Sequence, residues 1–247
     1  ANIQFIALGE DGTFSADQVA HVLRPSDIHT PHSRLVWLEN THNRGGGRIF
    51  PLDQARKIGT LAHSMRLSVH VDGARLLNAS VASARPPHEL VSFADSASIC
   101  LSKGLGAPVG SVLAGTKAFI ANALRWRKRL GGGMRQVGIL AAAGLYALQH
   151  HLSRLADDHA NAQLLAQRLT NVDAISLDLS AVETNIVLFE LRAGAPPLQE
   201  VLRRCQRRGV ALCPFGERQL RAVTHLDVDS TACHRAADVI AEVLREP

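Results

Sequence analysis

Two stretches of the sequence lead to side chains that could do chemistry. Residues 67–71 alternate in polarity and are rich in β-formers, which predicts a buried strand that ends at Asp72. A second apolar run, residues 97–101, leads to Lys103 and then breaks into several glycines. In an open parallel sheet, ligands bind beyond the carboxyl ends of the strands. We therefore expect one carboxylate and one amine at a common ligand site.

A carboxylate and a lysine placed in this way suit pyridoxal-phosphate chemistry. The lysine holds the cofactor covalently, and the carboxylate keeps the pyridine nitrogen protonated, so that the ring can accept electrons from a substrate. Each residue alone also has an ordinary explanation. An aspartate at a strand end often caps a turn or a helix, and a lysine beside glycines is usually a solvated surface residue. The combination of the two favours the functional interpretation.

The segments around these residues resemble the low-specificity L-threonine aldolases, a branch of the β-eliminating lyases. Five separated segments match in the family's order. They are LENTHN (38–43), HVDGAR (70–75), LSKGLGAPVGS (101–111), GGGMRQ (131–136) and RAVTHLDV (221–228). The resemblance implies an α/β protein of pyridoxal-phosphate fold type I, like aspartate aminotransferase. Its large domain would have a mainly parallel sheet, and a small α/β domain would follow at the C-terminus.

The resemblance also implies roles at the cofactor, which would be pyridoxal 5'-phosphate. Lys103 would hold the cofactor and act in catalysis, and Asp72 would bind the pyridine nitrogen. Ser102 and Arg135 would be further cofactor contacts. Lys128 and Arg135 match positions that approach the cofactor region of a neighbouring subunit, so the resemblance implies a homotetramer with shared sites.

Three further residues match positions that the family uses for the substrate. Arg75 and Arg221 would bind the substrate carboxylate, for which the rigid guanidinium fork is suited. His29 would lie near the substrate hydroxyl as the candidate base. Alternatives remain open: Arg75 in a structural ion pair with Asp72 or a neighbour, Arg221 as a surface residue, and His29 as a loop histidine without a role.

The function implied by the resemblance is cleavage of L-threonine or L-allo-threonine to glycine and acetaldehyde, which would serve threonine breakdown and glycine formation. The first residue corresponds to a point well inside the family's large domain. The family's phosphate-binding glycine turn and ring-stacking histidine therefore have no counterpart, as in a fragment, a splice form or a late start. The alternatives are an impaired or non-catalytic aldolase-like chain, a partner subunit, or another pyridoxal-phosphate reaction such as β-elimination.

Composition limits the possible classes of protein. The chain has 247 residues with 46% apolar and 20% charged content, which suits one large domain or a large and a small one. Its net charge of +5 could suggest nucleic acid, but the basic residues are scattered without an aromatic-studded patch. The basic run 125–129 is explained more simply as a solvated helix end.

The four cysteines have no metal-binding spacing, so we expect reduced thiols, no metal and a cytoplasmic location. No apolar run could span a bilayer and no secretory signal opens the sequence, so we expect no membrane partner.

Hydrophobic periodicity predicts alternating strands and helices. We expect a partial large domain over residues 1–155 and a small domain over residues 156–247. The predicted strands are 2–8, 34–39, 67–71, 97–101, 109–115, 185–191 and 220–224, and the predicted helices are 15–23, 51–65, 116–130, 137–155, 197–208 and 232–244.

Overall fold

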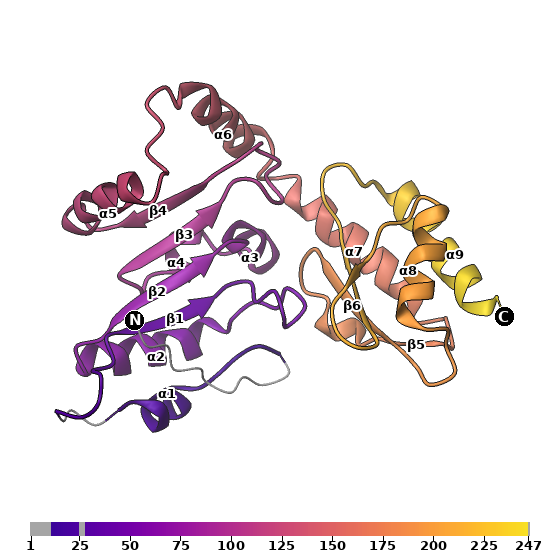
Figure 1. Cartoon of the computed structure of the whole chain (residues 1–247), viewed down its shortest axis with the longest axis horizontal. Coiled ribbons are helices and arrows are strands. Elements are labelled where there is room, and N and C mark those ends of the chain that lie inside the picture. Colours follow the sequence, from indigo (N-terminus) through magenta and orange to yellow (C-terminus); the bar gives the residue numbers. More distant parts are fainter. Residues whose placement is uncertain (1–10, 25–27, 247) are drawn as a thin grey trace. The chain divides into compact units, whose positions relative to one another are not determined.

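A computed structural model describes residues 11–24 and 28–246 of the chain (Figure 1). The predicted strand 2–8 lies outside the described residues. Contacts within the chain define two compact units. The first contains the chain up to His42 together with Ile49–Leu152, and the second contains Asn43–Arg48 together with Ser153–Pro247. A short segment in the first part of the chain therefore belongs to the C-terminal unit.

The first unit is built on a four-stranded sheet with the strand order β1-β2-β3-β4 (Figure 1). The first three strands are parallel, and β4 is antiparallel to β3. This arrangement confirms the predicted α/β fold with a mainly parallel sheet. The strands are β1 (Leu35–Glu39), β2 (Ser68–Gly73), β3 (Ser96–Cys100) and β4 (Ser111–Gly115).

Helix α2 connects the first two parallel strands. It buries Ala55, Ile58 and Ala62 in a core cluster that also contains Leu38 and Val69 from the sheet. The strand, helix and parallel strand form the predicted βαβ unit. The helices of the first compact unit are α1 (Ala16–Val22), α2 (Leu52–Ser64), α3 (Leu76–Ser83), α4 (Pro87–Leu90), α5 (Lys117–Arg129) and α6 (Gly138–His150).

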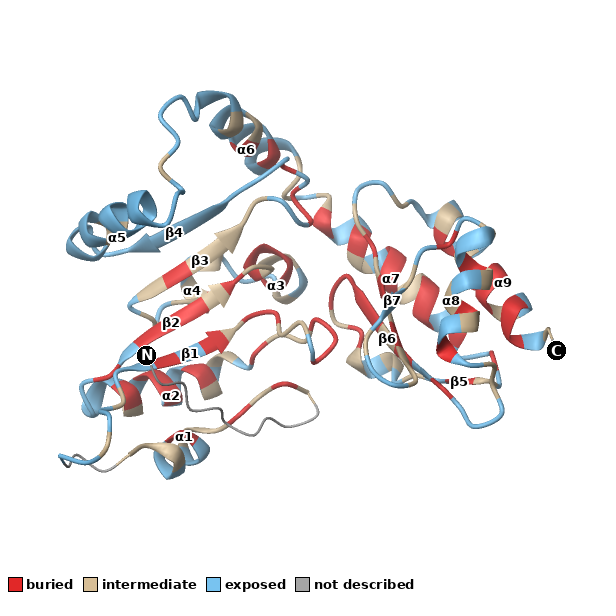
Figure 2. Ribbon diagram, in the orientation of Figure 1, coloured by how far each residue is buried: buried red, intermediate tan, exposed pale blue. Residues whose placement is uncertain are grey.

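The last third of the first unit is unusually exposed. All of β4 and nearly all of α5 are exposed, as the pale blue ribbon in Figure 2 shows. Large apolar side chains after α5 are exposed as well: Leu130, which follows α5, is 81% exposed, and Ile139 in α6 is 85% exposed. Within the described part of the chain, no helix has both the length and the apolar character needed to cross a bilayer.

The predicted helix 137–155 was wrong in its extent. Helix α6 ends at His150, and α7 (Leu155–Leu169) is a separate helix that belongs to the second unit. Residues 149–154 contain neither proline nor glycine, so no helix-breaking residue marked the break. His151, the residue that caps the end of α6, contacts the backbone carbonyl of Leu105 in the first unit.

The second unit packs three helices on a small antiparallel sheet with the strand order β5-β6-β8-β7. Phe189 and Leu220 of the sheet and Ile240 of the last helix are fully buried in one core. The predicted strands 185–191 and 220–224 and the predicted helices 197–208 and 232–244 are present. The elements are α7, β5 (Ile175–Ser176), η1 (Leu179–Ala181), β6 (Ile186–Leu191), α8 (Leu198–Arg207), β7 (Cys213–Pro214), β8 (Gln219–Val223) and α9 (Ser230–Arg245).

Candidate functional site

Strand β2 places Asp72 at the carboxyl edge of the first sheet. Its side chain is half-buried, and Oδ1 accepts a hydrogen bond of 3.1 Å from the amide of Ala74. The backbone carbonyl of Asp72 accepts a second bond of 2.9 Å from the amide of Asn40. The next residue must be small, because a Cβ at Gly73 would lie 2.6 Å from the carbonyl oxygen of Ser98. Close packing of β2 against β3 therefore fixes the backbone position from which the Asp72 side chain extends.

His70 lies two residues earlier and thus on the same face of the strand as the carboxylate. Its Nδ1 is 2.8 Å from Oγ of Ser96, and its ring packs edge-on to Trp37 with centroids 4.7 Å apart. Burial lowers the pKa of His70 and outweighs the opposing effect of the negative Asp72. The imidazole is therefore mainly neutral at pH 7, and the Asp72 charge is not cancelled by this neighbour.

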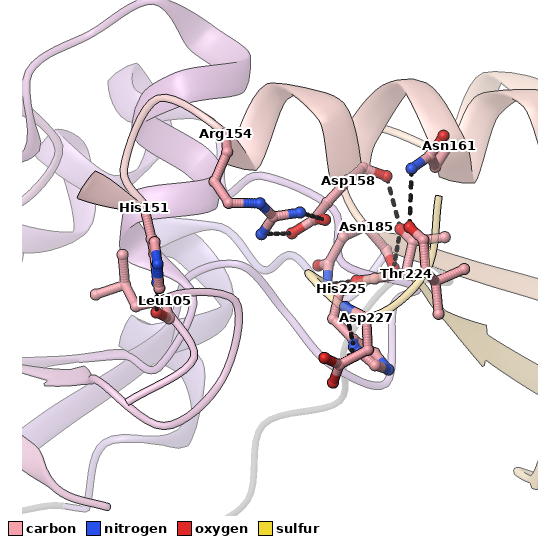
Figure 3. A network of polar contacts seen from close by, with 10 residues as sticks. Leu105, His151, Arg154, Asp158, Asn161, Asn185, Thr224, His225 and Asp227 are labelled. Atoms are coloured by element: carbon pink, nitrogen blue, oxygen red, sulfur yellow. Dashed lines mark hydrogen bonds and ion pairs between the residues drawn. The ribbon is translucent and has the colours of Figure 1, made fainter. Parts of the chain in front are cut away.

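Lys103 lies in the turn that follows β3, with an exposed side chain. Its carbonyl accepts a hydrogen bond of 2.8 Å from Gly106, which has a φ of 71° and so adopts a conformation that glycine tolerates best. His151 Nδ1 lies 2.6 Å from the carbonyl oxygen of Leu105, as Figure 3 shows. The turn is thus held at two points, while the amine of Lys103 stays accessible.

The sheet register brings Asp72 and Lys103 to one edge. Asp72 pairs with Ser98 across β2 and β3, which are parallel neighbours, and Lys103 follows the end of β3. Ser102 is exposed beside it, 3.4 Å from the sulfur of Cys100. Asp72 near the carboxyl end of β2 and Lys103 after β3 thus lie toward the carboxyl edge of the sheet, and their pairing at a common ligand site stays a prediction.

Arg75 lies at the start of helix α3, three residues beyond the carboxylate. It is half-buried, and its carbonyl accepts a bond of 3.1 Å from Ala79. This position puts its guanidinium on the segment that leaves the carboxyl end of β2. The role of Arg75 as a carboxylate binder stays a prediction.

The other predicted residues of the first unit are all exposed. His29 lies in a turn before β1, Lys128 in the last turn of α5, and Arg135 in the loop after it. A Cβ at Gly133 would lie 2.8 Å from Cδ of Lys128, so the backbone passes close to that side chain. The roles of these three residues stay predictions.

Arg221 belongs to strand β8 of the second unit and has well-defined neighbours there. Its Nη1 donates a hydrogen bond of 2.8 Å to Oδ1 of Asn43, and its Cζ lies 5.0 Å from the centroid of the Phe215 ring. Cζ of Arg44 lies 5.5 Å from the same centroid. Neither Asn43 nor Phe215 had been predicted as a site residue from the sequence. Asn43 ends the LENTHN segment, which was a usable signal, whereas no sequence pattern marked Phe215.

A buried polar network anchors the end of β8 (Figure 3). The Thr224 hydroxyl donates to the carbonyl of Asp158 at 2.6 Å, and Nδ2 of Asn185 donates to the carbonyl of Thr224 at 2.9 Å. The Asp158 side chain is fully buried and forms an ion pair with Arg154 through two hydrogen bonds. Sequence spacing of four residues on one helix was the available signal for that pair.

The residues of the first unit fit a pyridoxal-phosphate cofactor. A half-buried carboxylate beside a neutral histidine suits a protonated pyridine nitrogen, and an accessible lysine lies beyond the neighbouring strand. Fold and site together therefore define a chain of the pyridoxal-phosphate fold type I class.

Comparison with known proteins makes the assignment more specific. The chain belongs to the β-eliminating lyase family, whose model matches residues 1–192. It is 42% identical over 228 residues to low-specificity L-threonine aldolase 1 of Arabidopsis thaliana, covering 91% of this chain and 64% of that protein. It is also 42% identical over 227 residues to the low specificity L-threonine aldolase of Escherichia coli K12, covering 91% of this chain and 65% of that protein. The chain thus spans a little less than two thirds of these relatives.

Solved structures confirm the fold. A putative L-allo-threonine aldolase from Listeria monocytogenes matches with a TM-score of 0.75 at 21% identity, covering 96% of this chain and 66% of that one. A threonine aldolase from Leishmania major matches with a TM-score of 0.76 at 18% identity, covering 96% and 69%.

Proposed function

We propose that this chain serves pyridoxal-phosphate-dependent aldol cleavage of L-threonine and L-allo-threonine to glycine and acetaldehyde. The main support is the placement of Asp72 near the carboxyl end of β2 and of Lys103 after the carboxyl end of β3, the adjacent parallel strand. This arrangement occurs in a chain 42% identical to a low-specificity L-threonine aldolase. The family and the strand-end pair thus support the same chemistry.

The residues at the sheet edge would divide the work at the cofactor. When bound, the cofactor supplies a ring that accepts the electron pair of a broken Cα–Cβ bond. The Asp72 carboxylate would hold a proton at the pyridine nitrogen, aided by the neutral state of His70. Lys103 would hold the cofactor covalently, with Ser102 and Arg135 as further contacts.

The arginines would bind and orient the substrate. Arg75 and Arg221 would clamp its carboxylate, and two such anchors fix the orientation of the Cα–Cβ bond relative to the ring. His29 would accept the proton of the β-hydroxyl, which allows the aldehyde to leave. These roles follow the matched segments.

A labelling experiment tests the proposed function. The chain is incubated with pyridoxal 5'-phosphate, reduced with borohydride, and digested for peptide mapping. We expect label on Lys103 and its loss in Lys103→Arg, whereas Lys57→Arg on the exposed face of α2 keeps the label. Label elsewhere, or none, would contradict the cofactor role of Lys103.

A product assay then tests the reaction itself. Glycine and acetaldehyde from L-threonine would support aldol cleavage. Pyruvate or ammonia in their place would show that β-elimination is the reaction. A labelled chain that releases none of these products would support the alternative of a non-catalytic relative.

We also propose a homotetramer in the cytoplasm. Exposed apolar side chains such as Leu113, Ile139 and Leu145 support burial against another chain, because monomers rarely expose large apolar patches. All four cysteines carry free thiols, which suits a reducing compartment. Sedimentation velocity should give a tetramer; a monomer at micromolar concentration would contradict the assembly.

A further inference from the structure

The guanidinium of Arg221 is held by two side chains that no sequence pattern had assigned. Oδ1 of Asn43 accepts from Nη1 at 2.8 Å, and the Phe215 ring lies under Cζ with its centroid 5.0 Å away. The backbone that carries the ring is anchored, because the Phe215 amide donates a bond of 2.9 Å to the carbonyl of Gln219 in the β7–β8 hairpin. The hydrogen bond to Asn43 thus limits rotation of the guanidinium within its plane, and the Phe215 ring limits tilting of that plane.

The remaining donors of this guanidinium are not used within the described part of the chain. Nε of Arg221 is a buried atom without a hydrogen-bond acceptor there, and no carboxylate among those residues pairs with the charge. A half-buried cation without a counter-ion is costly, and a ligand carboxylate would recover that cost. The arrangement is therefore that of a guanidinium oriented in advance for an anion.

We propose that Phe215 is a positioning residue for Arg221, and that with Asn43 it sets the affinity for the carboxylate of the amino-acid substrate. This inference rests on the proposed function only in naming the substrate. Attraction between a guanidinium and an aromatic face stabilises one orientation of the fork. Preorganisation of that kind lowers the entropy lost when the carboxylate binds.

The substrate carboxylate keeps its charge throughout the reaction, so its binding contributes almost equally to ground state and transition state. Loss of such uniform binding raises KM and leaves kcat nearly unchanged. We expect Phe215→Leu to raise KM for L-threonine roughly threefold to tenfold, with a smaller change in kcat. Phe215→Tyr keeps the aromatic face and should restore the wild-type KM.

Arg44 provides a matched control, because its exposed guanidinium lies 5.5 Å from the same ring. If ring positioning of Arg221 is what matters, Arg44→Gln changes KM far less than Phe215→Leu does. Equal effects of the two variants would mean that general positive charge attracts the substrate, and would overturn the inference.

A nuclear magnetic resonance measurement separates this inference from the proposed function. The Nε–H resonance of Arg221, assigned by its absence in Arg221→Lys, should carry a ring-current shift that is lost in Phe215→Leu and kept in Phe215→Tyr. An unmoved resonance in Phe215→Leu would overturn the positioning role, whatever the activity. A wild-type chain without threonine cleavage but with the expected shifts would leave the positioning role supported and the proposed function refuted.

Discussion

Substitution of Gly73 by alanine should disturb the candidate site through the packing of two strands. A Cβ at this position would lie 2.6 Å from the carbonyl oxygen of Ser98 and 2.9 Å from Cβ of Leu76. Real Cβ atoms essentially never approach closer than 3.0 Å. One of the two neighbours is backbone of β3, so the clash cannot be relieved by rotating a side chain. The strands β2 and β3 must separate at the point where Asp72 leaves the sheet.

Overpacking of this kind costs about 1–3 kcal/mol of folding free energy. The smaller entropy of alanine in the unfolded chain offsets part of that cost, by about 0.4–1 kcal/mol. The mid-range net loss is about 1.3 kcal/mol, and with a urea m-value of about 2 kcal/mol/M it lowers the unfolding midpoint by roughly 0.65 M, within a full range of about 0–1.3 M. Urea titration followed by circular dichroism measures the midpoint. Cofactor affinity should fall as well, since the Asp72 carboxylate moves with the strand end.

Gly138→Ala is the matched control for Gly73→Ala. A Cβ at Gly138 would meet nothing within 4 Å, and the residue begins helix α6, where alanine is favoured over glycine. We expect an unchanged or slightly higher midpoint for this variant. If Gly73→Ala lowers the midpoint no more than Gly138→Ala, the reasoning from close strand packing is refuted.

Three further predictions concern the second unit. Asp158→Ala removes the buried partner of Arg154 and should cost about 3 kcal/mol in urea unfolding; a loss below 1 kcal/mol would show that the pair contributes no more than a surface pair. Burial lowers the pKa of His159 from 6.5 and outweighs the attraction of Asp158, so only the unfolded chain gains a proton as the pH falls past that value. Stability from this group is complete above pH 6.5 and is lost below it, so urea midpoints of His159→Gln should depend less on pH between about 8 and 5. Burial also raises the pKa of Cys205 to about 11, so Ellman's reagent should modify exposed Cys213 in the native chain and Cys205 only after unfolding.

Local patterns predicted the elements that position the cofactor site. Alternation before Asp72 and the apolar run before Lys103 each correspond to a strand, and the helix between β1 and β2 follows the predicted spacing. The predicted helix 15–23 is also present as α1, which Ser15 opens in a capping box with Gln18. These features depend on neighbours in sequence, which is why sequence alone is sufficient for them.

Features that depend on distant residues were not predictable in the same way. At the break after His150, His151 contacts Leu105, which lies 46 residues away in the sequence. The antiparallel direction of β4 relative to β3 was not predicted either, because no residue pattern of the segment marks strand direction. Phe215 gained its role only from the folded position of Arg221. In each case the contacting residue becomes a neighbour only in the folded chain, and no local sequence pattern identifies it.

The assignment of Asn43–Arg48 to the second unit has a consequence for how the chain folds. The Thr184 hydroxyl bonds the carbonyl of Gly47 across 137 residues, and Arg221 reaches Asn43 across 178 residues. Contacts of such high sequence separation close large loops and slow folding. During synthesis, the second unit cannot be completed until β8 has left the ribosome. A fragment of residues 153–247 would lack the segment Asn43–Arg48 and therefore the hydrogen bond from Arg221 to Asn43. Refolding should therefore show an early phase in the first unit and a later one in which the Arg221 contacts form.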